Sequence, residues 1–241
     1  MWYIPFLRAW RAFATYSIIV VGVAIVGIAI RYSPGVQIRP DQVAKVSVDL
    51  IAIATVVTAL IAILATVMGL SLAAENEGHL ELTWTKPVSR ESYALAVFGV
   101  DTLAMIAAYI VSMVAAVIVC DVWVGRQVVI PISPLWLVAA VLVLPIYVYA
   151  IIAAGSASLK RSRGMVAGLF WPVTLGLVAA SFVRIDIVHN IAHALNTINP
   201  VIMFGSHNGV SDATPSTYLL GLLMTAVFLT LAVLQWKRLE A

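Results

Sequence analysis

Few residues of this chain combine types and spacing that could do chemistry. His189 and His193 lie four apart on one face of a predicted helix, next to Asp186, and this spacing can hold a metal ion. Two histidines without a third good ligand are a weak signal, and no His-Glu-x-x-His pattern occurs. We therefore expect no metal site and interpret the three side chains as the polar face of a surface helix.

A second candidate is Asp101, roughly two helical turns into a long apolar run. A carboxylate at membrane depth is costly and faces a bundle interior or water. Three interpretations stay open: it lines a translocation path, it pairs with a basic group near the cytosolic end, or it reaches toward the inner interface. Trp171, followed by Pro172, indicates a bend with a bulky side chain facing the same path.

The sequence gives no reason to expect an enzyme. No paired catalytic residues fall at membrane depth, and no Gly-x-x-x-x-Gly-Lys-Ser/Thr pattern occurs. The predicted cytosolic loops are too short for a nucleotide-binding domain. If ATP drives this protein, a partner chain binds the ATP and magnesium, and this chain binds no cofactor of its own.

Composition determines the class of protein that must position these residues. Of the 241 residues, 63% are hydrophobic and 10% are charged, whereas soluble domains carry about 25% charged residues. A water-soluble fold could not enclose so many apolar side chains behind a polar surface, so we predict an integral membrane protein. Apolar runs of about 20 residues indicate helices, because isolated strands would leave amides unpaired in lipid. The net charge of +3 is small and indicates no nucleic-acid partner.

Six apolar runs predict six transmembrane helices in a single all-α domain over residues 1–241. Proline at position 145 predicts a kink inside the fourth run. The runs cover approximately residues 15–30, 46–74, 93–120, 135–159, 165–183 and 218–236.

The first residues predict an additional interfacial helix. Phe6, Trp10 and Phe13 recur at helical spacing, with Arg8 and Arg11 elsewhere on the wheel. This pattern is typical of an amphipathic helix at the membrane surface. The alternative is a frayed cytosolic tail.

A second amphipathic helix is predicted between the fifth and sixth runs, on the extracellular side. It ends at Asn199-Pro200. Its apolar stripe consists of Ile187, Val188, Ile191, Ala192, Leu195 and Ile198, and its polar stripe of Asp186, His189, Asn190, His193 and Asn196. Such a helix lies on, or dips into, the outer leaflet of the bilayer.

Lysine and arginine predict the orientation, because they are enriched in cytoplasmic segments. With the N-terminus inside, the inner segments hold nine of the 14 basic residues and the outer segments hold five. We therefore expect a multi-pass protein of the cell (plasma or inner) membrane with both termini in the cytoplasm.

A charged loop follows the second apolar run. Four of the chain's 11 acidic residues fall in ENEGHLELTWTKPVSRESY, residues 75–93: Glu75, Glu77, Glu81 and Glu91. A membrane protein that concentrates charge in one loop presents that loop to a partner, although a solvated connector is the alternative.

This loop resembles the first cytosolic loop of type-2 ABC exporter permeases. The matching positions are Glu75, Glu77, Gly78, Leu82, Pro87, Ser89 and Arg90. In that family the loop forms a coupling helix that docks on the ATPase. The resemblance implies a complex of two soluble ATPase subunits with this chain and a second copy of it, or a related permease.

The implied function is export of an amphipathic or lipidic substrate, driven by ATP hydrolysis on the partner. The alternative from another class is an ATP-independent secondary transporter or channel, which would need intramembrane charges or broken helices as ion sites. A membrane enzyme or assembly factor would have to use the polar stripe with His189 and His193.

Overall fold

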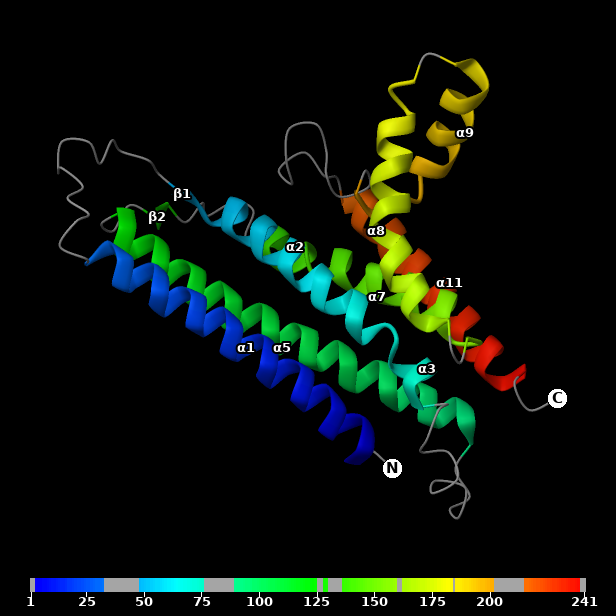
Figure 1. Ribbon diagram of the computed structural model, residues 1–241, viewed down its shortest axis with the longest axis horizontal. Helices are drawn as coiled ribbons and strands as arrows, with labels where there is room; N and C mark the ends of the chain where they lie inside the picture. Colours follow the sequence, from blue (N-terminus) through cyan, green and yellow to red (C-terminus); the bar gives the residue numbers. More distant parts are fainter. Residues whose placement is uncertain are drawn as a thin grey trace.

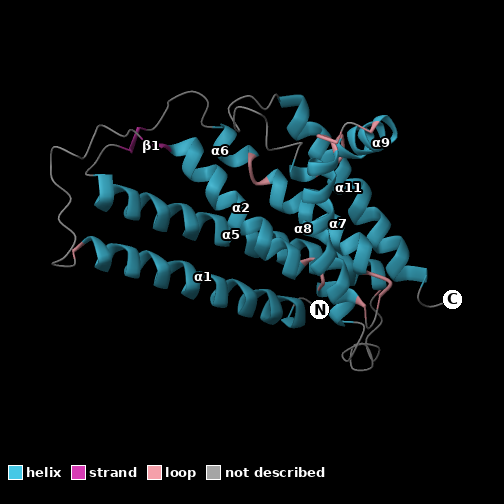
Figure 2. Cartoon of the chain, turned by 45° about the horizontal axis from the view of Figure 1, so that its top comes forward, coloured by secondary structure: helices cyan, strands magenta, loops and turns pink. Residues whose placement is uncertain are grey.

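The computed structural model describes residues 3–32, 48–75, 89–124, 128–129, 136–159, 162–183, 185–201 and 215–238. Nearly all of these residues are helical (Figure 2). The long helices are α1 (Tyr3–Arg31), α2 (Leu50–Met68), α5 (Arg90–Val124), α7 (Val143–Ser156), α8 (Arg163–Ala180) and α11 (Pro215–Arg238). The shorter helices are α3 (Ser71–Glu75), α6 (Trp136–Ala140) and α9 (Asp186–Asn196).

Among the described residues, six helical segments are long and apolar enough to cross a membrane, and each overlaps one of the predicted runs. They are Tyr3–Arg31, Leu50–Ala74, Arg90–Trp123, Val138–Ser156, Arg163–Ala180 and Pro215–Arg238. The prediction of an all-α chain with six spanning helices is confirmed at this level. The pattern was readable because a bilayer requires each crossing segment to satisfy its own backbone hydrogen bonds.

The buried core lies around α7. Helices α2 and α11 pack on α7, and α5 packs between α1 and α2 (Figure 1). Tyr147, Tyr149 and Ile152 of α7 are fully buried, as is Ile61 of α2. Outside the helices, β1 (Val48–Asp49) pairs in parallel with β2 (Val128–Val129).

The predicted separate interfacial helix is wrong in one respect: it is not separate. Helix α1 runs without a break from Tyr3 to Arg31, because after Pro5 in its first turn the segment around the expected junction contains no glycine or proline to interrupt it. At 29 residues it is about 43 Å long, against a hydrocarbon core of about 30 Å. Phe6 and Trp10 stack at 6.3 Å between ring centroids and are exposed.

The predicted kink near Pro145 is present as a break in the helix. Helix α6 ends at Ala140, Val141 and Leu142 form a turn, and α7 begins at Val143. Proline has no N–H for the carbonyl four residues earlier, which is that of Val141, and its ring clashes with that carbonyl. The interruption therefore falls one turn before the proline.

A second break separates α2 from α3 at Gly69 and Leu70. Gly69 lies so close to α7 that a Cβ on it would be 2.7 Å from Cβ of Ile152 and 3.0 Å from the carbonyl oxygen of Tyr149. The Ser156 hydroxyl donates to the Gly69 carbonyl at 3.2 Å. Glycine is therefore required for this approach, and the turn is fixed against α7.

Helices α1 and α5 run parallel and share polar contacts along their length (Figure 1). Near the middle, the hydroxyls of Tyr16 and Ser112 lie 2.9 Å apart. Farther along, Trp123 Nε1 donates to the Gly27 carbonyl at 3.2 Å. These contacts hold the two helices in one register.

Candidate functional site at the loop-bearing end of the bundle

The predicted coupling loop joins α3 to α5. Glu75 is the last residue of α3, and Arg90 is the first residue of α5. The Ser89 hydroxyl accepts a hydrogen bond from the Ser92 amide at 3.2 Å and caps the start of α5. Glu77, Gly78, Leu82 and Pro87 lie outside the described residues, so their part in coupling stays a prediction.

A surface ion pair connects the start of α5 to the end of the chain. Lys237 Nζ of α11 lies 2.6 Å from Glu91 Oε1. Both side chains are at least half exposed, so the pair adds little stability. Its position shows that the start of α5 and the end of α11 lie at the same end of the bundle (Figure 1).

A buried polar cluster around Asp101 includes a residue of α3, the helix that precedes this loop. Asp101 is fully buried, and Arg8 Nη2 lies 3.1 Å from its Oδ1 and 3.3 Å from its Oδ2. Oδ2 also accepts hydrogen bonds from the Ser71 hydroxyl at 2.5 Å and the Tyr149 hydroxyl at 2.9 Å. The cluster, defined as Arg8, Ser71, Asp101 and Tyr149, joins α1, α3, α5 and α7.

The cluster is a buried carboxylate, that of Asp101, surrounded by hydrogen-bond donors. An unpaired carboxylate in an apolar interior is strongly unfavourable, and it persists when a cation and further donors surround it. Arg8 supplies the cation while 27% of its side chain stays exposed. Its Nη1 also donates to the Ser71 carbonyl at 3.4 Å.

Of the three interpretations of Asp101, pairing with a basic group is the one the structure shows. The sequence placed Arg8 on a surface helix and gave no sign of Ser71 or Tyr149 as partners. Arg8 is 93 residues from Asp101, so no local pattern links them. A usable signal was that Arg8 and Asp101 are charges on the apolar segments of two parallel spans.

Trp171 lies elsewhere in the bundle. Its Nε1 donates to Thr66 Oγ1 of α2 at 3.1 Å, and its ring meets Phe170 edge-on at 5.2 Å. The polar contacts of Trp171 and Asp101 thus go to different residues. Their joint role in a translocation path stays a prediction.

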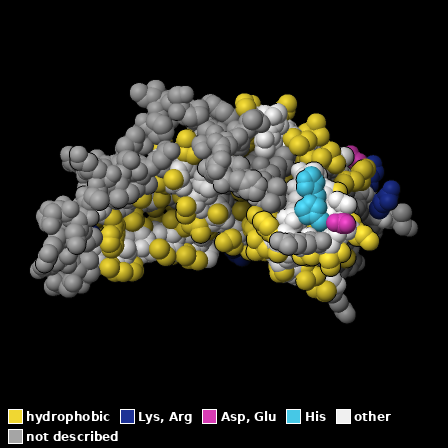
Figure 3. All heavy atoms as spheres, turned by 90° about the horizontal axis from the view of Figure 1, so that it is seen from above, with side chains coloured by type: hydrophobic (Ala, Val, Ile, Leu, Met, Phe, Trp, Pro, Cys, Tyr) yellow, Lys and Arg dark blue, Asp and Glu magenta, His cyan; other side chains and the backbone are white. Residues whose placement is uncertain are grey.

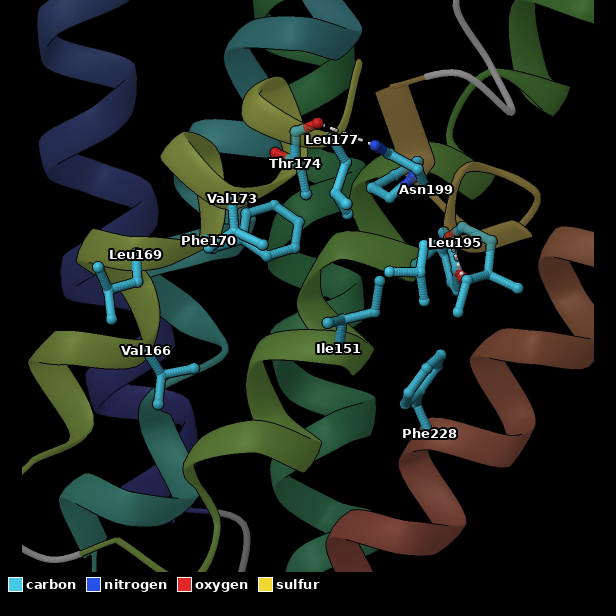
Figure 4. Close-up of a pocket in the computed structure, with 13 residues that line it drawn as sticks. Ile151, Val166, Leu169, Phe170, Val173, Thr174, Leu177, Leu195, Asn199 and Phe228 are labelled. Atoms are coloured by element: carbon cyan, nitrogen blue, oxygen red, sulfur yellow. Dashed lines mark hydrogen bonds between the residues drawn. The ribbon is translucent and has the colours of Figure 1, made fainter. Parts of the chain in front are cut away.

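An apolar cavity of about 360 Å³ opens between α7, α8, α11 and the segment after α9. Figure 4 shows Val166, Leu169 and Phe170 of α8 on one side and Phe228 of α11 on the other. Its polar groups are already engaged, since the Tyr147 hydroxyl donates to the Ile198 carbonyl at 2.7 Å and Thr174 Oγ1 to the Trp171 carbonyl at 3.0 Å. The cavity therefore offers an apolar surface.

The predicted amphipathic helix is α9, but its polar stripe is corrected at one position. Asn196 is buried, not on the polar surface, because its Nδ2 donates to the Leu177 carbonyl of α8 at 3.1 Å. Asn199 is also buried and donates to the Thr174 carbonyl at 2.9 Å. Ala192 and Asn196 face the protein, while Ile187 of the apolar stripe is 72% exposed. That exposure is the arrangement expected for a helix lying on lipid.

The two histidines of α9 lie at the surface. Their ring centroids are 6.3 Å apart, and His189 Nδ1 is 2.9 Å from the Ser181 carbonyl oxygen. Figure 3 shows histidines beside an acidic side chain on this face. Among the residues that the structure describes, no three His, Cys, Asp or Glu side chains converge on a metal position.

Fold and site together define the class: an all-α membrane protein with six helices long and apolar enough to span the bilayer. Comparison with protein-family models, with curated proteins and with solved structures finds no match.

Proposed function

We propose that this chain is the membrane subunit of a type-2 ABC exporter in the cell membrane. Two six-span subunits pair, and two soluble ATPase subunits bind the loops between α3 and α5. ATP hydrolysis on the partners shifts the spans between states that bind an amphipathic or lipidic substrate differently. Both termini and the loop lie in the cytoplasm.

The observation that carries this proposal is the acidic, proline-containing segment at residues 75–90, between the second and third spans. The end of α3 and the start of α5, which flank this segment, lie at the same end of the bundle as the start of α1 and the end of α11 (Figure 1). Six crossings bring both termini to one side, and the lysine and arginine distribution favours the cytoplasm for that side.

The buried cluster weighs against the ATP-independent alternative. An ion-coupled transporter needs an intramembrane charge that can exchange its ion or proton. Asp101 is enclosed by Arg8, Ser71 and Tyr149 and has the geometry of a structural ion pair. We therefore assign it to holding the bundle together.

The test is a pull-down of the tagged chain from its native membrane in mild detergent, with the bound proteins identified. We expect a soluble ATPase with a Walker motif, lost when Glu77 and Gly78 are replaced by Lys and Val. The matched control is Asp186→Lys on α9, which changes charge away from the loop and should keep the ATPase bound. Recovery of the chain alone from all samples would contradict the proposal.

A further inference from the structure

The buried cluster joins four helices, but it does not hold them equally. Arg8 and Asp101 form a charge pair in which Nη2 reaches both carboxylate oxygens. Ser71 contributes a neutral hydroxyl to Oδ2. The Ser71 bond is itself charge-assisted, because its acceptor is a carboxylate. Losing this one neutral donor leaves the charge of Asp101 paired, whereas separating Arg8 from Asp101 would leave a buried carboxylate without its cation. Ser71 is thus the weaker attachment.

The helices on the strong side are also held by other contacts. Helices α1 and α5 share the Tyr16–Ser112 and Gly27–Trp123 contacts. Helix α7 is packed between α2 and α11, and its Tyr149 is fully buried. These three helices would stay together if Ser71 were released.

Helix α3 has the opposite character. It is five residues long, well below the length at which a helix is stable alone. It follows the turn at Gly69, which is fixed against α7 by the Ser156 hydroxyl and by close packing on Ile152. Beyond this fixed point, the Ser71 hydroxyl attaches α3 to Asp101, and a longer contact of 3.4 Å runs from Arg8 Nη1 to the Ser71 carbonyl. The buried side chains of Leu72 and Ala73 support this attachment.

We propose that the cluster is a two-part joint. Arg8, Asp101 and Tyr149 hold α1, α5 and α7 together permanently, and Ser71 attaches α3 by a bond that is released first when the chain after α3 is displaced. Gly69 is the fixed pivot of that movement. The joint goes beyond the exporter proposal, because it does not depend on what binds residues 76–88.

The test compares two variants that each remove one hydroxyl donor to the same carboxylate oxygen: Ser71→Ala and Tyr149→Phe. Amide hydrogen exchange of the full-length chain in detergent micelles is followed by mass spectrometry. In Ser71→Ala, exchange over residues 71–75 should rise by roughly tenfold, while residues 3–14 of α1 and 97–105 of α5 stay unchanged. In Tyr149→Phe, residues 71–75 should keep their protection.

Thr230→Ala is the control, since the Thr230 hydroxyl donates within its own helix to the Ala226 carbonyl. It should leave residues 71–75 at the level of the unaltered protein. The joint is overturned if Ser71→Ala leaves residues 71–75 unchanged. It is equally overturned if exchange rises in α1 and α5 as much as in α3. Both variants remove one hydroxyl and keep Arg8 and Asp101, so we expect the fold to be retained.

Discussion

Two parts of the helical bundle, an early one and a later one along the chain, are held together by different kinds of contact. The part built from α1, α2, α5 and α7 contains the Asp101 cluster and the polar contacts between α1 and α5. The part built from α8 and α9 leaves an apolar cavity beside α7 and α11, and Asn196 and Asn199 attach α9 and the residues after it to α8. A buried charge pair fixes helices over long sequence distances, whereas side-chain amides on carbonyls fix a short helix locally.

The comparison has a consequence for motion. Lipid tails are as apolar as leucine, so helices in a bilayer are held by close packing and polar contacts. The first part has both close packing and polar contacts. At Gly69 the backbone approaches Ile152 so closely that no Cβ would fit between them. We therefore expect α8 and α9 to open at lower free energy than the cluster-bearing helices.

Removing the charge at Asp101 should have the largest effect. Asp101→Ala leaves Arg8 without its buried partner and should lower the free energy of unfolding by about 3–5 kcal/mol. Chemical unfolding in detergent micelles, followed by circular dichroism, measures it. The control is Asp121→Ala, at an exposed position of α5, which should change little. Equal losses in the two variants would remove the distinction between the cluster and the rest of α5.

Filling the space at Gly69 should have the next largest effect. Gly69→Ala places a methyl group 2.7 Å from the Ile152 Cβ, and overpacking of this kind costs about 1–3 kcal/mol. Adding Ile152→Ala should not recover the loss, because alanine keeps the Cβ that the new methyl group meets, as thermal unfolding of the double variant would show. Gly22→Ala on α1 is the control, because a Cβ there meets nothing within 4 Å. A Gly69→Ala protein as stable as Gly22→Ala would contradict the close approach.

Releasing α9 should have a smaller and local effect. Asn199→Ala removes donors to the Thr174 carbonyl and to Asn196 Oδ1, and the acceptor of the Val201 amide. We expect a loss of about 1–2 kcal/mol, seen as faster amide exchange in α9 with α1 and α5 unaffected. Asn190→Ala, at an exposed position of α9, should leave the exchange unchanged. If α1 and α5 respond as strongly as α9, the two parts are not independent.

Removing the surface ion pair between Lys237 and Glu91 should have the smallest effect on stability. Replacing Lys237 by Met removes the ion pair with Glu91, whose side chains are 61% and 50% exposed, and should cost about 0.2–1 kcal/mol. Raising the salt concentration should reduce the difference from the unaltered protein. A loss comparable to that of Asp101→Ala would mean that the pair is shielded from water in the assembled protein.

The sequence could predict the helices because the bilayer imposes a rule on each segment separately. An apolar run of sufficient length must form a helix that satisfies its own amides, so all six spans and the amphipathic helix α9 were readable. The break before Pro145 followed from a property of proline itself. The junction after residue 13 was misjudged because an amphipathic pattern near a terminus does not show whether the helix continues.

The cluster was decided by the tertiary structure alone. Asp101 was recognisable as a costly charge in an apolar run, but its partners come from three other helices, and Arg8 is 93 residues away. The same holds for Gly69, whose role depends on Ile152 of another helix, and for Asn196, which turns from the polar stripe to a carbonyl of α8. Composition and periodicity report the preference of each segment for lipid or water. The partner of a buried polar group depends on which helices pack together, and the register of that packing is not contained in any single segment.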